Sequence, residues 1–493
     1  MWIPRRILQI SNGRLLPGNS IPDFPKKGSD RSFSNRKNFL FISTACIFML
    51  MKKRRKLSIA ILFALCFTVL PLNATFFPYL MYEKELPNHM RIVVVPIRDA
   101  RTVSFATLVQ TGSRNETDHG YTGYAHLLEH MMFRGSENYS TEDRVNLLYR
   151  YGGDSNAFTS MDYTCYTVSC DPAGWQEVLA LEADRLMRLS LKKEDFKAET
   201  GAVIGEFGIS EKYPSNRMDN ALRACMFQGH TYEHSVIGYR EDVMNMPDGY
   251  EYIRDFYKKE YRPDKTIMFI AGKIDRPGDV LSKIEDLFSG WTYEPAPLPT
   301  IRPSLKPVSC QDTLYDASIP APRVKIAWKI PGYAQDRLGH IAARILAEHY
   351  FSDNSPLMIK LRDEKKWISS GTYSVPLTID PYWISLDLVL TEEGVGAAIG
   401  DYVLGILQDS RYTLKAGELE SLKKRQFYKT HMQLSSPSSI LRVLADYAHI
   451  KGDPQEINHY FLALERLEIL DIRQCKENYL TRRNQSELWM LAR

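Results

Sequence analysis

The feature that most constrains the fold is an internal repeat. Residues 126–133 (HLLEHMMF) align with residues 345–351 (ILAEHYF) at an offset of 219. Two single positions, 207 and 261, align with positions 427 and 479 at offsets of 220 and 218. Three similar offsets in the same order predict two copies of one domain. Residues 290–307 contain five prolines, which exclude helix and central strand, and we expect an extended linker there.

Secondary-structure patterns within the copies are mixed. Three segments rich in β-branched residues predict strands, at 91–96, 102–109 and 266–271. The apolar spacing in 175–189 predicts an amphipathic helix. Within each copy the predicted strands lie near the two ends and the predicted helices lie between them, which favours the α+β class. We therefore predict two tandem homologous α+β domains, at 80–289 and 308–493, each with a mainly antiparallel sheet covered by helices.

The N-terminus has the composition of a targeting segment. A basic run at 52–56 precedes an apolar run from Leu57 to Leu72 and then the small residue Ala74, which is the order of a secretory signal peptide. We expect residues 51–74 to be that signal and residues 1–50 to be untranslated or disordered. The protein would then be secreted or periplasmic, with no stable membrane span after cleavage. A membrane anchor and an organellar transit peptide are the alternatives.

Charge and cysteine content limit the partners and the redox chemistry. After residue 56 the chain holds 50 Lys and Arg against 57 Asp and Glu, so the body has no basic footprint for nucleic acid. Five cysteines remain in the body, at positions 165, 170, 225, 310 and 475. Their odd number and irregular spacing indicate no disulfide framework, and we expect buried free thiols. Cys165 and Cys170 lie five apart in a strand-like run, so they face opposite sides of it.

The chemistry is concentrated in residues 124–133. His126 and His130 lie four apart in an apolar segment without Gly or Pro, and a helix there places both imidazoles on one face. Glu129 lies on the same side, where its carboxylate can take a proton from a water. Zinc suits two histidines and a carboxylate with one position left for water. The pattern is the inverted zinc-protease motif, His-x-x-Glu-His; a helix with two ordinary histidines is the alternative.

At this motif the sequence resembles the insulinase/pitrilysin family of zinc metallopeptidases, nearest its processing-peptidase-like subgroup, over most of residues 85–490. The resemblance implies Glu206, 76 positions after His130, as the third Zn²⁺ ligand. It also implies Glu199, one heptad earlier, as a carboxylate that orients a ligand or assists the base. Thr200 stands where the family usually has Arg. A solvated helix face is the alternative for both glutamates.

A second match concerns substrate binding. Residues 152–166 resemble the family's Gly-Gly-x-x-Asn-Ala-x-Thr segment, which implies that Asn156 and Ala157 lie on an edge strand that pairs with extended peptide. An ordinary hairpin is the alternative. The resemblance also implies that Arg362 helps to bind substrate and stabilise the oxyanion. The Tyr expected seven residues later is Ser369, and Tyr373 is the nearest phenol.

The second copy lacks the metal ligands. Ile345 replaces the first His, and Arg425 or Gln426 replaces the ligand Glu, so we expect an inactive domain. The resemblance implies that the chain forms half of a clamshell chamber, closed by a homodimer or by a sister subunit that supplies Arg and Tyr. The expected activity is zinc-dependent endopeptidase hydrolysis of peptides or unfolded segments. The alternatives are a non-catalytic or partner-dependent subunit and a secreted peptide-binding module with structural zinc.

Overall fold

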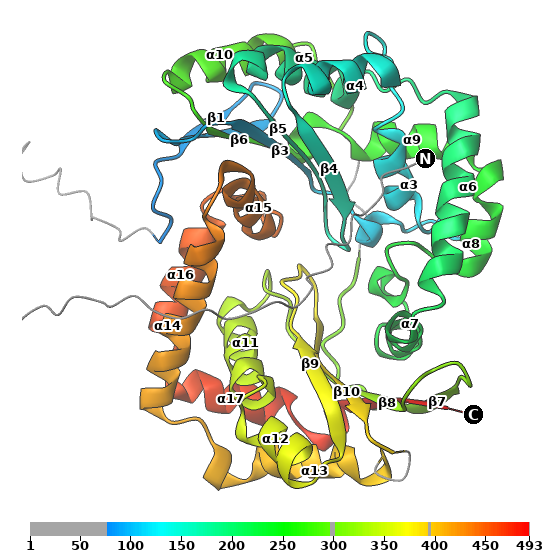
Figure 1. Ribbon diagram of the computed structural model, residues 1–493, viewed down its shortest axis with the longest axis vertical. Coiled ribbons are helices and arrows are strands. Elements are labelled where there is room, and N and C mark those ends of the chain that lie inside the picture. Colours follow the sequence, from blue (N-terminus) through cyan, green and yellow to red (C-terminus); the bar gives the residue numbers. More distant parts are fainter. Residues whose placement is uncertain (1–75, 296–300, 393–395, 493) are drawn as a thin grey trace, which may run out of the picture. The chain divides into compact units, whose positions relative to one another are not determined.

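The computed structural model describes residues 76–295, 301–392 and 396–492 (Figure 1). The expected signal, residues 51–74, and the preceding residues 1–50 lie outside them. The first sheet contains β1 (Tyr82–Glu85), β2 (Arg91–Pro96), β3 (Val103–Val109), β4 (Asp154–Thr159), β5 (Thr164–Cys170) and β6 (Thr266–Gly272). The second contains β7 (Gln311–Tyr315), β8 (Arg323–Ile330), β9 (Ile368–Ser374), β10 (Tyr382–Leu390) and β11 (Gln485–Leu491). The described part of residues 290–307 forms neither helix nor strand.

The two sheets share one strand order. The first runs β1-β2-β6-β3-β5-β4 and the second runs β7-β11-β8-β10-β9. Each has one parallel pair, β2 with β6 and β7 with β11, followed by antiparallel neighbours. Among the strands that the structure describes, β1 of the first sheet has no counterpart in the second. The predicted fold, two tandem α+β domains with mainly antiparallel sheets, is confirmed.

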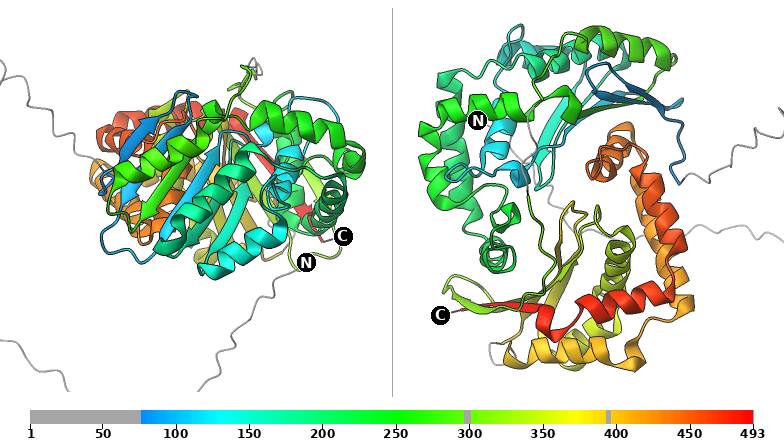
Figure 2. Two further views of the ribbon diagram at one scale, coloured as in Figure 1. Left: turned by 90° about the horizontal axis from the view of Figure 1, so that it is seen from above. Right: turned by 180° about the vertical axis from the view of Figure 1, so that it is seen from behind.

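Helices cover both sheets. Those of the first domain are α3 (Tyr124–Met131), α4 (Thr141–Arg150), α5 (Trp175–Met187), α6 (Lys193–Ser210), α7 (Pro214–Met226), α8 (Arg240–Asn245), α9 (Tyr250–Glu260) and α10 (Pro277–Phe288). Those of the second are α11 (Arg337–Phe351), α12 (Pro356–Ile359), α13 (Gly396–Gln408), α14 (Ala416–Gln433), α15 (Pro437–Ala448), α16 (Glu456–Arg466) and α17 (Ile469–Tyr479). Helices α5 and α10 lie across the outer face of the first sheet (Figure 2).

The first sheet is buried on both faces. Alternate residues of its central strands enter two different apolar clusters, so Val93 and Ala106 belong to one and Val94 and Phe105 to the other. This follows from the period of two that side chains have along a strand. Cys165 and Cys170 divide in the same way, each buried in a different cluster. The prediction that these two thiols face opposite sides is confirmed.

Each domain supplies a helix to the sheet of the other. Helix α15 packs on β3 and β6 of the first sheet, and helix α7 packs on β11 of the second (Figure 1). Both helices begin with proline at equivalent places in the repeat, which suits the first turn because its N–H groups have no partner inside the helix. The exchange joins the two domains through buried apolar surface.

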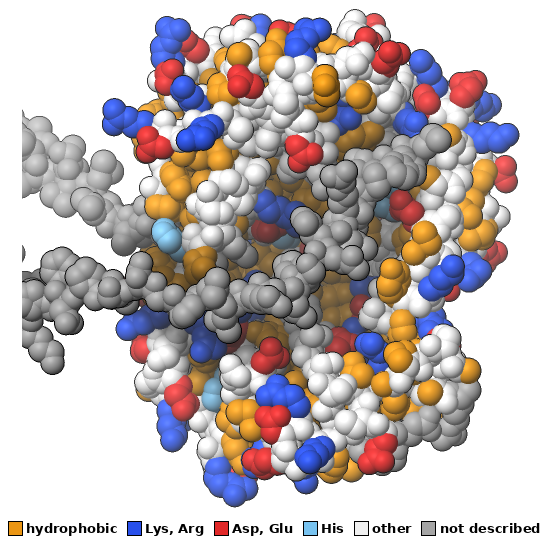
Figure 3. All heavy atoms as spheres, viewed as in Figure 1, with side chains coloured by type: hydrophobic (Ala, Val, Ile, Leu, Met, Phe, Trp, Pro, Cys, Tyr) orange, Lys and Arg blue, Asp and Glu red, His pale blue; other side chains and the backbone are white. Residues whose placement is uncertain are grey.

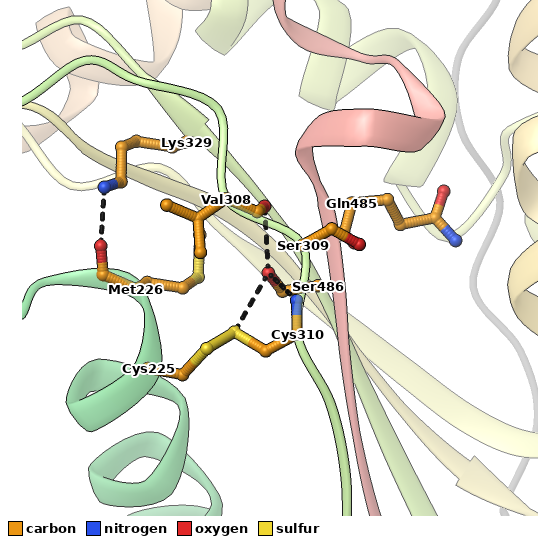
Figure 4. The surroundings of a disulfide bond; sticks show 8 residues. All are labelled: Cys225, Met226, Val308, Ser309, Cys310, Lys329, Gln485 and Ser486. Carbon is orange, nitrogen blue, oxygen red and sulfur yellow. Dashed lines mark hydrogen bonds between the residues drawn. A yellow bond between two sulfur atoms is a disulfide. The ribbon is translucent and has the colours of Figure 1, made fainter.

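A disulfide reinforces this junction and corrects the prediction of free thiols. Cys225 on α7 is bonded to Cys310, which lies immediately before β7, and 85 residues separate them (Figure 4). Lys329 donates to the carbonyl oxygen of Met226 beside it, at 2.5 Å. The remaining described cysteines, including Cys475, are free and buried, as predicted. Cys225 and Cys310 lie close together only because α7 packs against the second sheet. Their spacing in the sequence therefore gave no indication of the bond.

The surface has mixed charge. Lys and Arg side chains alternate with Asp and Glu over the face shown in Figure 3, and the same face is hollowed between the domains, with hydrophobic side chains in the hollow. Within the described ranges, no helix is both long enough and apolar enough to cross a bilayer.

Candidate metal centre

The helix that carries the histidines is fixed at its start. Helix α3 begins after Gly123, whose φ of 88° favours glycine and whose added Cβ would lie 2.4 Å from the carbonyl oxygen of Ile237. The buried carboxylate of Glu116 accepts the N–H groups of Gly123 at 2.8 Å and Ala125 at 2.7 Å. The first N–H groups of a helix have no acceptor inside it, and the side chain of Glu116 supplies one. These contacts fix the direction of α3 and therefore of its side chains.

Three predicted ligands converge. Nε2 of His126 and Nε2 of His130 each lie 3.6 Å from Oε2 of Glu206, which projects from the neighbouring helix α6. Ligand atoms bound at 2.0–2.2 Å around a tetrahedral zinc ion lie about 3.3–3.6 Å apart. The donor set, two imidazole nitrogens and one carboxylate oxygen, therefore fits a zinc ion in both chemistry and spacing. The Glu206 side chain is 48% exposed, which leaves this side open to solvent.

The pKa values of the two histidines shift in opposite directions. Burial, with the neighbouring His130 second, lowers the pKa of His126 to about 4, so this imidazole stays neutral and keeps a lone pair for a metal. Burial also lowers the pKa of His130, but the hydrogen bond to Glu199 and the charge of Glu206 outweigh it and raise the pKa overall. His126 Nδ1 is buried and has no hydrogen-bond partner among the described residues.

Glu199 orients the second histidine. Nδ1 of His130 donates to Oε2 of Glu199 at 2.8 Å, so Nε2 is the ring nitrogen that faces Glu206. Arg134 binds the other oxygen of Glu199. Burial raises the pKa of Glu199, but the bonds from His130 and Arg134 outweigh it and hold the pKa below its usual range. Glu199 is therefore an ionised carboxylate that fixes the tautomer and the ring orientation.

Glu129 lies beside the three ligand atoms without joining them. Thr159, at the end of β4, donates its hydroxyl to Oε2 of Glu129 at 2.6 Å and holds the carboxylate in place. Burial raises the pKa of Glu129, opposed by this hydrogen bond and by the charge of His130.

Four of the residues described above, His126, Glu129, Thr159 and Glu206, line one cleft of about 520 Å³. Its lining residues come from α3, β4, α6, α7 and the segment before α8: His126, Glu129, Ala157, Phe158, Thr159, Glu206, Ile209, Ser210, Tyr213, Asn216, Val236 and Ile237. Strand β4 is the edge strand of its sheet. Ala157 donates its N–H to the side-chain oxygen of its neighbour Asn156, at 2.9 Å. Of the two residues predicted to bind substrate, Ala157 lines the cleft and Asn156 is not among its lining residues.

The structure does not bring Arg362 to this cleft. Its guanidinium pairs with Asp363, at 2.9 and 3.0 Å, in a short π-helix of the second domain. Ser369 is exposed on β9, and its hydroxyl donates to the carbonyl oxygen of Val389 at 3.4 Å. Tyr373, the nearest phenol in sequence, donates to the buried carboxylate of Glu348 at 2.5 Å.

Glu348 occupies the place in the second domain that Glu129 occupies in the first. It accepts from Tyr373 at 2.5 Å, Arg425 at 3.1 Å and Lys429 at 3.2 Å. These donors fully engage the carboxylate, so it is a structural group here.

Sequence reasoning missed three residues of the centre: Thr159, Arg134 and Tyr213. Thr159 stands in the segment that matched the family, two positions after Ala157, but only the folded hairpin shows that its hydroxyl reaches Glu129. Arg134 lies four positions after His130, a helical spacing that could have indicated a shared partner. Tyr213 precedes α7, and no local signal places it in the cleft.

Known proteins with similar sequences belong to the insulinase family of peptidases or are named zinc proteases. Residues 91–240 match the insulinase (peptidase family M16) domain, and residues 249–426 match the peptidase M16 inactive domain. A protein named zinc protease PqqE from Helicobacter pylori is 24% identical over 402 residues, which are 80% of this chain and 89% of that protein. Together the two family models cover residues 91–240 and 249–426, which include the histidine motif and most of the second domain.

Solved structures share the fold. The crystal structure of a protease from Helicobacter pylori matches with a TM-score of 0.76 at 21% identity, over 84% of this chain and 99% of that chain. The periplasmic protease PqqL from Escherichia coli matches with a TM-score of 0.67 at 19% identity, over 84% of this chain and 48% of that chain. At these identities the likeness concerns the fold alone.

Proposed function

Since the chain belongs to the insulinase family (peptidase family M16), we propose that it is a zinc-dependent endopeptidase that hydrolyses peptides or unfolded segments. One observation carries the proposal: His126, His130 and Glu206 form a cluster that could hold a metal ion, and two of them, His126 and Glu206, line a cleft together with a separate carboxylate, Glu129, and the edge strand β4. A structural zinc site has no use for a carboxylate that does not bind the ion, whereas a hydrolase needs a base there.

His126, His130 and Glu206 would hold the Zn²⁺ ion. The distances of 3.6 Å between their donor atoms support this, as does the name zinc protease that the relative from Helicobacter pylori carries. When bound, zinc supplies Lewis acidity, which acidifies water and polarises a carbonyl group. Glu199 would keep His130 in the tautomer that presents Nε2.

Glu129 would be the general base and then the general acid. Its carboxylate accepts a proton from the attacking water and later gives that proton to the amine that leaves. The hydroxyl of Thr159 holds one oxygen of Glu129, so the other remains available for proton transfer. In this proposal the carboxylate returns to its starting state after each cleavage.

Asn156 and Ala157 would bind the substrate backbone. An extended peptide can add to the free edge of β4 through main-chain hydrogen bonds, and this binding is indifferent to most side chains. Ala157 lines the same cleft as His126 and Glu129, so a peptide on that edge would pass the metal centre. This arrangement favours substrates without folded structure, because only an extended segment can add as a strand.

A second chain would complete the enzyme, in a homodimer or with a sister subunit. The described residues that line the cleft include no Lys or Arg, and Arg362 is paired with Asp363 elsewhere. These observations favour a partner-dependent peptidase as the second candidate. In that form, a sister subunit supplies the cation and the phenol that stabilise the oxyanion, and the two chains close a chamber around the peptide.

We place the enzyme in the periplasm or outside the cell. The signal-like residues 51–74 support this location, and the fold relative from Escherichia coli is named a periplasmic protease.

Cleavage of a quenched fluorescent peptide library by the purified protein tests the proposal. We expect internal cleavage that is lost when zinc is removed and restored when zinc is added back. Product masses distinguish endopeptidase cuts from trimming of the ends. Zinc-loaded protein that cleaves nothing would contradict a self-sufficient enzyme and direct the search to a sister chain.

A further inference from the structure

We propose that Asp453, Glu456 and His459 form a second metal site, which binds one divalent cation of the zinc class at the start of α16. The site goes beyond the proposed peptidase activity and shares no residue with the first centre. Its three ligand atoms lie within 4.8 Å of one another.

The local chain holds the three side chains on one side of the helix start. Asp453 precedes α16, and its backbone oxygen accepts the N–H of Glu456 at 3.0 Å. Its Oδ1 accepts the N–H of Gln455 at 2.9 Å, which leaves Oδ2 free to face the helix. Glu456 and His459 lie three apart, so their side chains are neighbours on the helix surface.

The donor distances are those of an ion's ligands. His459 Nδ1 lies 3.4 Å from Asp453 Oδ2 and 3.6 Å from Glu456 Oε2, and neither contact has hydrogen-bond geometry. The corresponding distances in the first centre are both 3.6 Å. Ligand atoms held at 2.0–2.2 Å around a tetrahedral ion lie about 3.3–3.6 Å apart.

A buried oxygen of Glu456 has no hydrogen-bond partner among the described residues, which supports a bound cation at this site. Glu456 is 1% exposed. Its Oε1 accepts from the hydroxyl of Tyr333 at 2.9 Å and from the guanidinium of Arg337. Its Oε2, the atom that faces His459, has no hydrogen-bond partner among the residues that the structure describes. Buried carboxylate oxygens are normally satisfied, and a bound cation would satisfy this one.

The donor set selects the class of ion. One imidazole nitrogen with two carboxylate oxygens suits zinc and similar first-row ions, whereas magnesium and calcium prefer oxygen ligands alone. The side chains of Asp453 and His459 are 34% and 44% exposed, so an ion can enter from solvent and water can complete its coordination. A protonated His459 that pairs with both carboxylates is the competing arrangement, and the test separates the two.

The site lies at the junction of the two domains. Asn458 accepts the N–H of Phe77 at 2.9 Å, and Gln455 binds Glu83 on β1. Glu456 contacts Tyr333 of the second domain through Oε1. A cation at the start of α16 would therefore fix the segment that both domains contact. Its role would be structural, since none of its ligands lines the cleft of the first centre.

Zinc stoichiometry tests the proposal. The purified protein is stripped with chelator, reloaded with excess zinc, freed of unbound metal by gel filtration and analysed by plasma mass spectrometry. We expect two zinc ions per chain in the wild type, one in His459→Ala, one in His130→Ala and none in the double variant. His431→Ala, at an exposed histidine of α14, is the matched control and should retain two.

The zinc contents of the wild type, the two single variants and the double variant test the second site independently of the first centre. A wild-type content that His459→Ala leaves unchanged overturns the second site, while loss of one zinc in His130→Ala still supports the first. Asp453→Asn keeps the shape of the side chain and should also lose one zinc ion. This variant keeps the test decisive if His459→Ala does not fold. In the His130→Ala background, added zinc should raise the melting temperature. A shift that persists after His459→Ala, or one given by magnesium but not by zinc, would overturn the assignment.

Discussion

His130 donates its Nδ1–H to Glu199 at 2.8 Å, so a carboxylate outside the group of three ligand atoms orients one member of that group. We expect Glu199→Gln to weaken zinc affinity about 10- to 100-fold, because the amide is a weaker acceptor and leaves the tautomer less fixed. Competition titration with a chromophoric chelator measures the affinity. Glu194→Gln, at an exposed position on the same helix, is the control. Equal zinc affinity in the two variants would contradict the orienting role.

The disulfide between Cys225 and Cys310 should stabilise the folded chain. It closes a segment of 85 residues between α7 and the second domain, so it restricts the unfolded state. We expect the double variant Cys225→Ser/Cys310→Ser to lose about 2–4 kcal/mol in the free energy of unfolding, measured in urea. Reducing agent should lower the melting temperature of the wild type and leave that of the double variant unchanged. A reductant effect of equal size in both would show that the bond contributes nothing.

The exchanged helix α15 should make the domains unfold together. Leu444 is fully buried in the cluster that α15 shares with the first sheet. We expect Leu444→Ala to cost about 2–5 kcal/mol in the free energy of unfolding, through lost burial and the cavity left behind. Leu470→Ala, at a side chain that is 56% exposed on α17, should cost far less. Two separate denaturation transitions in the wild type would contradict a joint core.

Buried His340 should make the fold sensitive to acid. Its Nδ1–H donates to the carbonyl oxygen of Pro331 at 3.0 Å, and burial lowers its pKa from 6.5 to about 4. Between pH 6.5 and about 4, His340 therefore binds fewer protons in the folded state than in the unfolded state. The stability that neutral His340 contributes is fully present above pH 6.5 and is lost as the pH falls towards 4.

The histidine contribution can be isolated by substitution. His340→Asn can keep the N–H donor and does not titrate, so the fall in melting temperature between pH 6.5 and 4 should be smaller in this variant than in the wild type. His119→Asn, at an exposed position, is the control and should follow the wild type. The same acid slope in all three proteins would contradict the assignment.

Local patterns predicted the elements well because periodicity is a local property. Strand β2 has the predicted bounds, and helix α5 begins at the predicted residue and ends two positions earlier, at Met187. The repeat predicted two copies of one domain, and the two sheets have the same order in five of their strands. The pairing of α3 with α6, by contrast, joins residues 76 positions apart. Spacing alone left Glu206 on a solvated face, and the family resemblance was needed to select it.

Contacts that depend on the exchanged helices were not predictable from spacing. Cys225 meets Cys310 only because α7 crosses to the second sheet. The partners of Glu456 come from the other end of the second domain, so no local motif marks the cluster around it. The role of Arg362 came from alignment alone, and its guanidinium is paired with the adjacent Asp363.

Peptide cleavage by Glu129→Gln, with zinc content measured on the same sample, tests whether Glu129 is the base. We expect cleavage to fall at least about 100-fold with wild-type zinc content, because the amide cannot accept the proton but no ligand is removed. Glu142→Gln, at an exposed position on α4, should retain wild-type cleavage. Cleavage by Glu129→Gln at the wild-type rate would show that this carboxylate is not the base of a zinc peptidase.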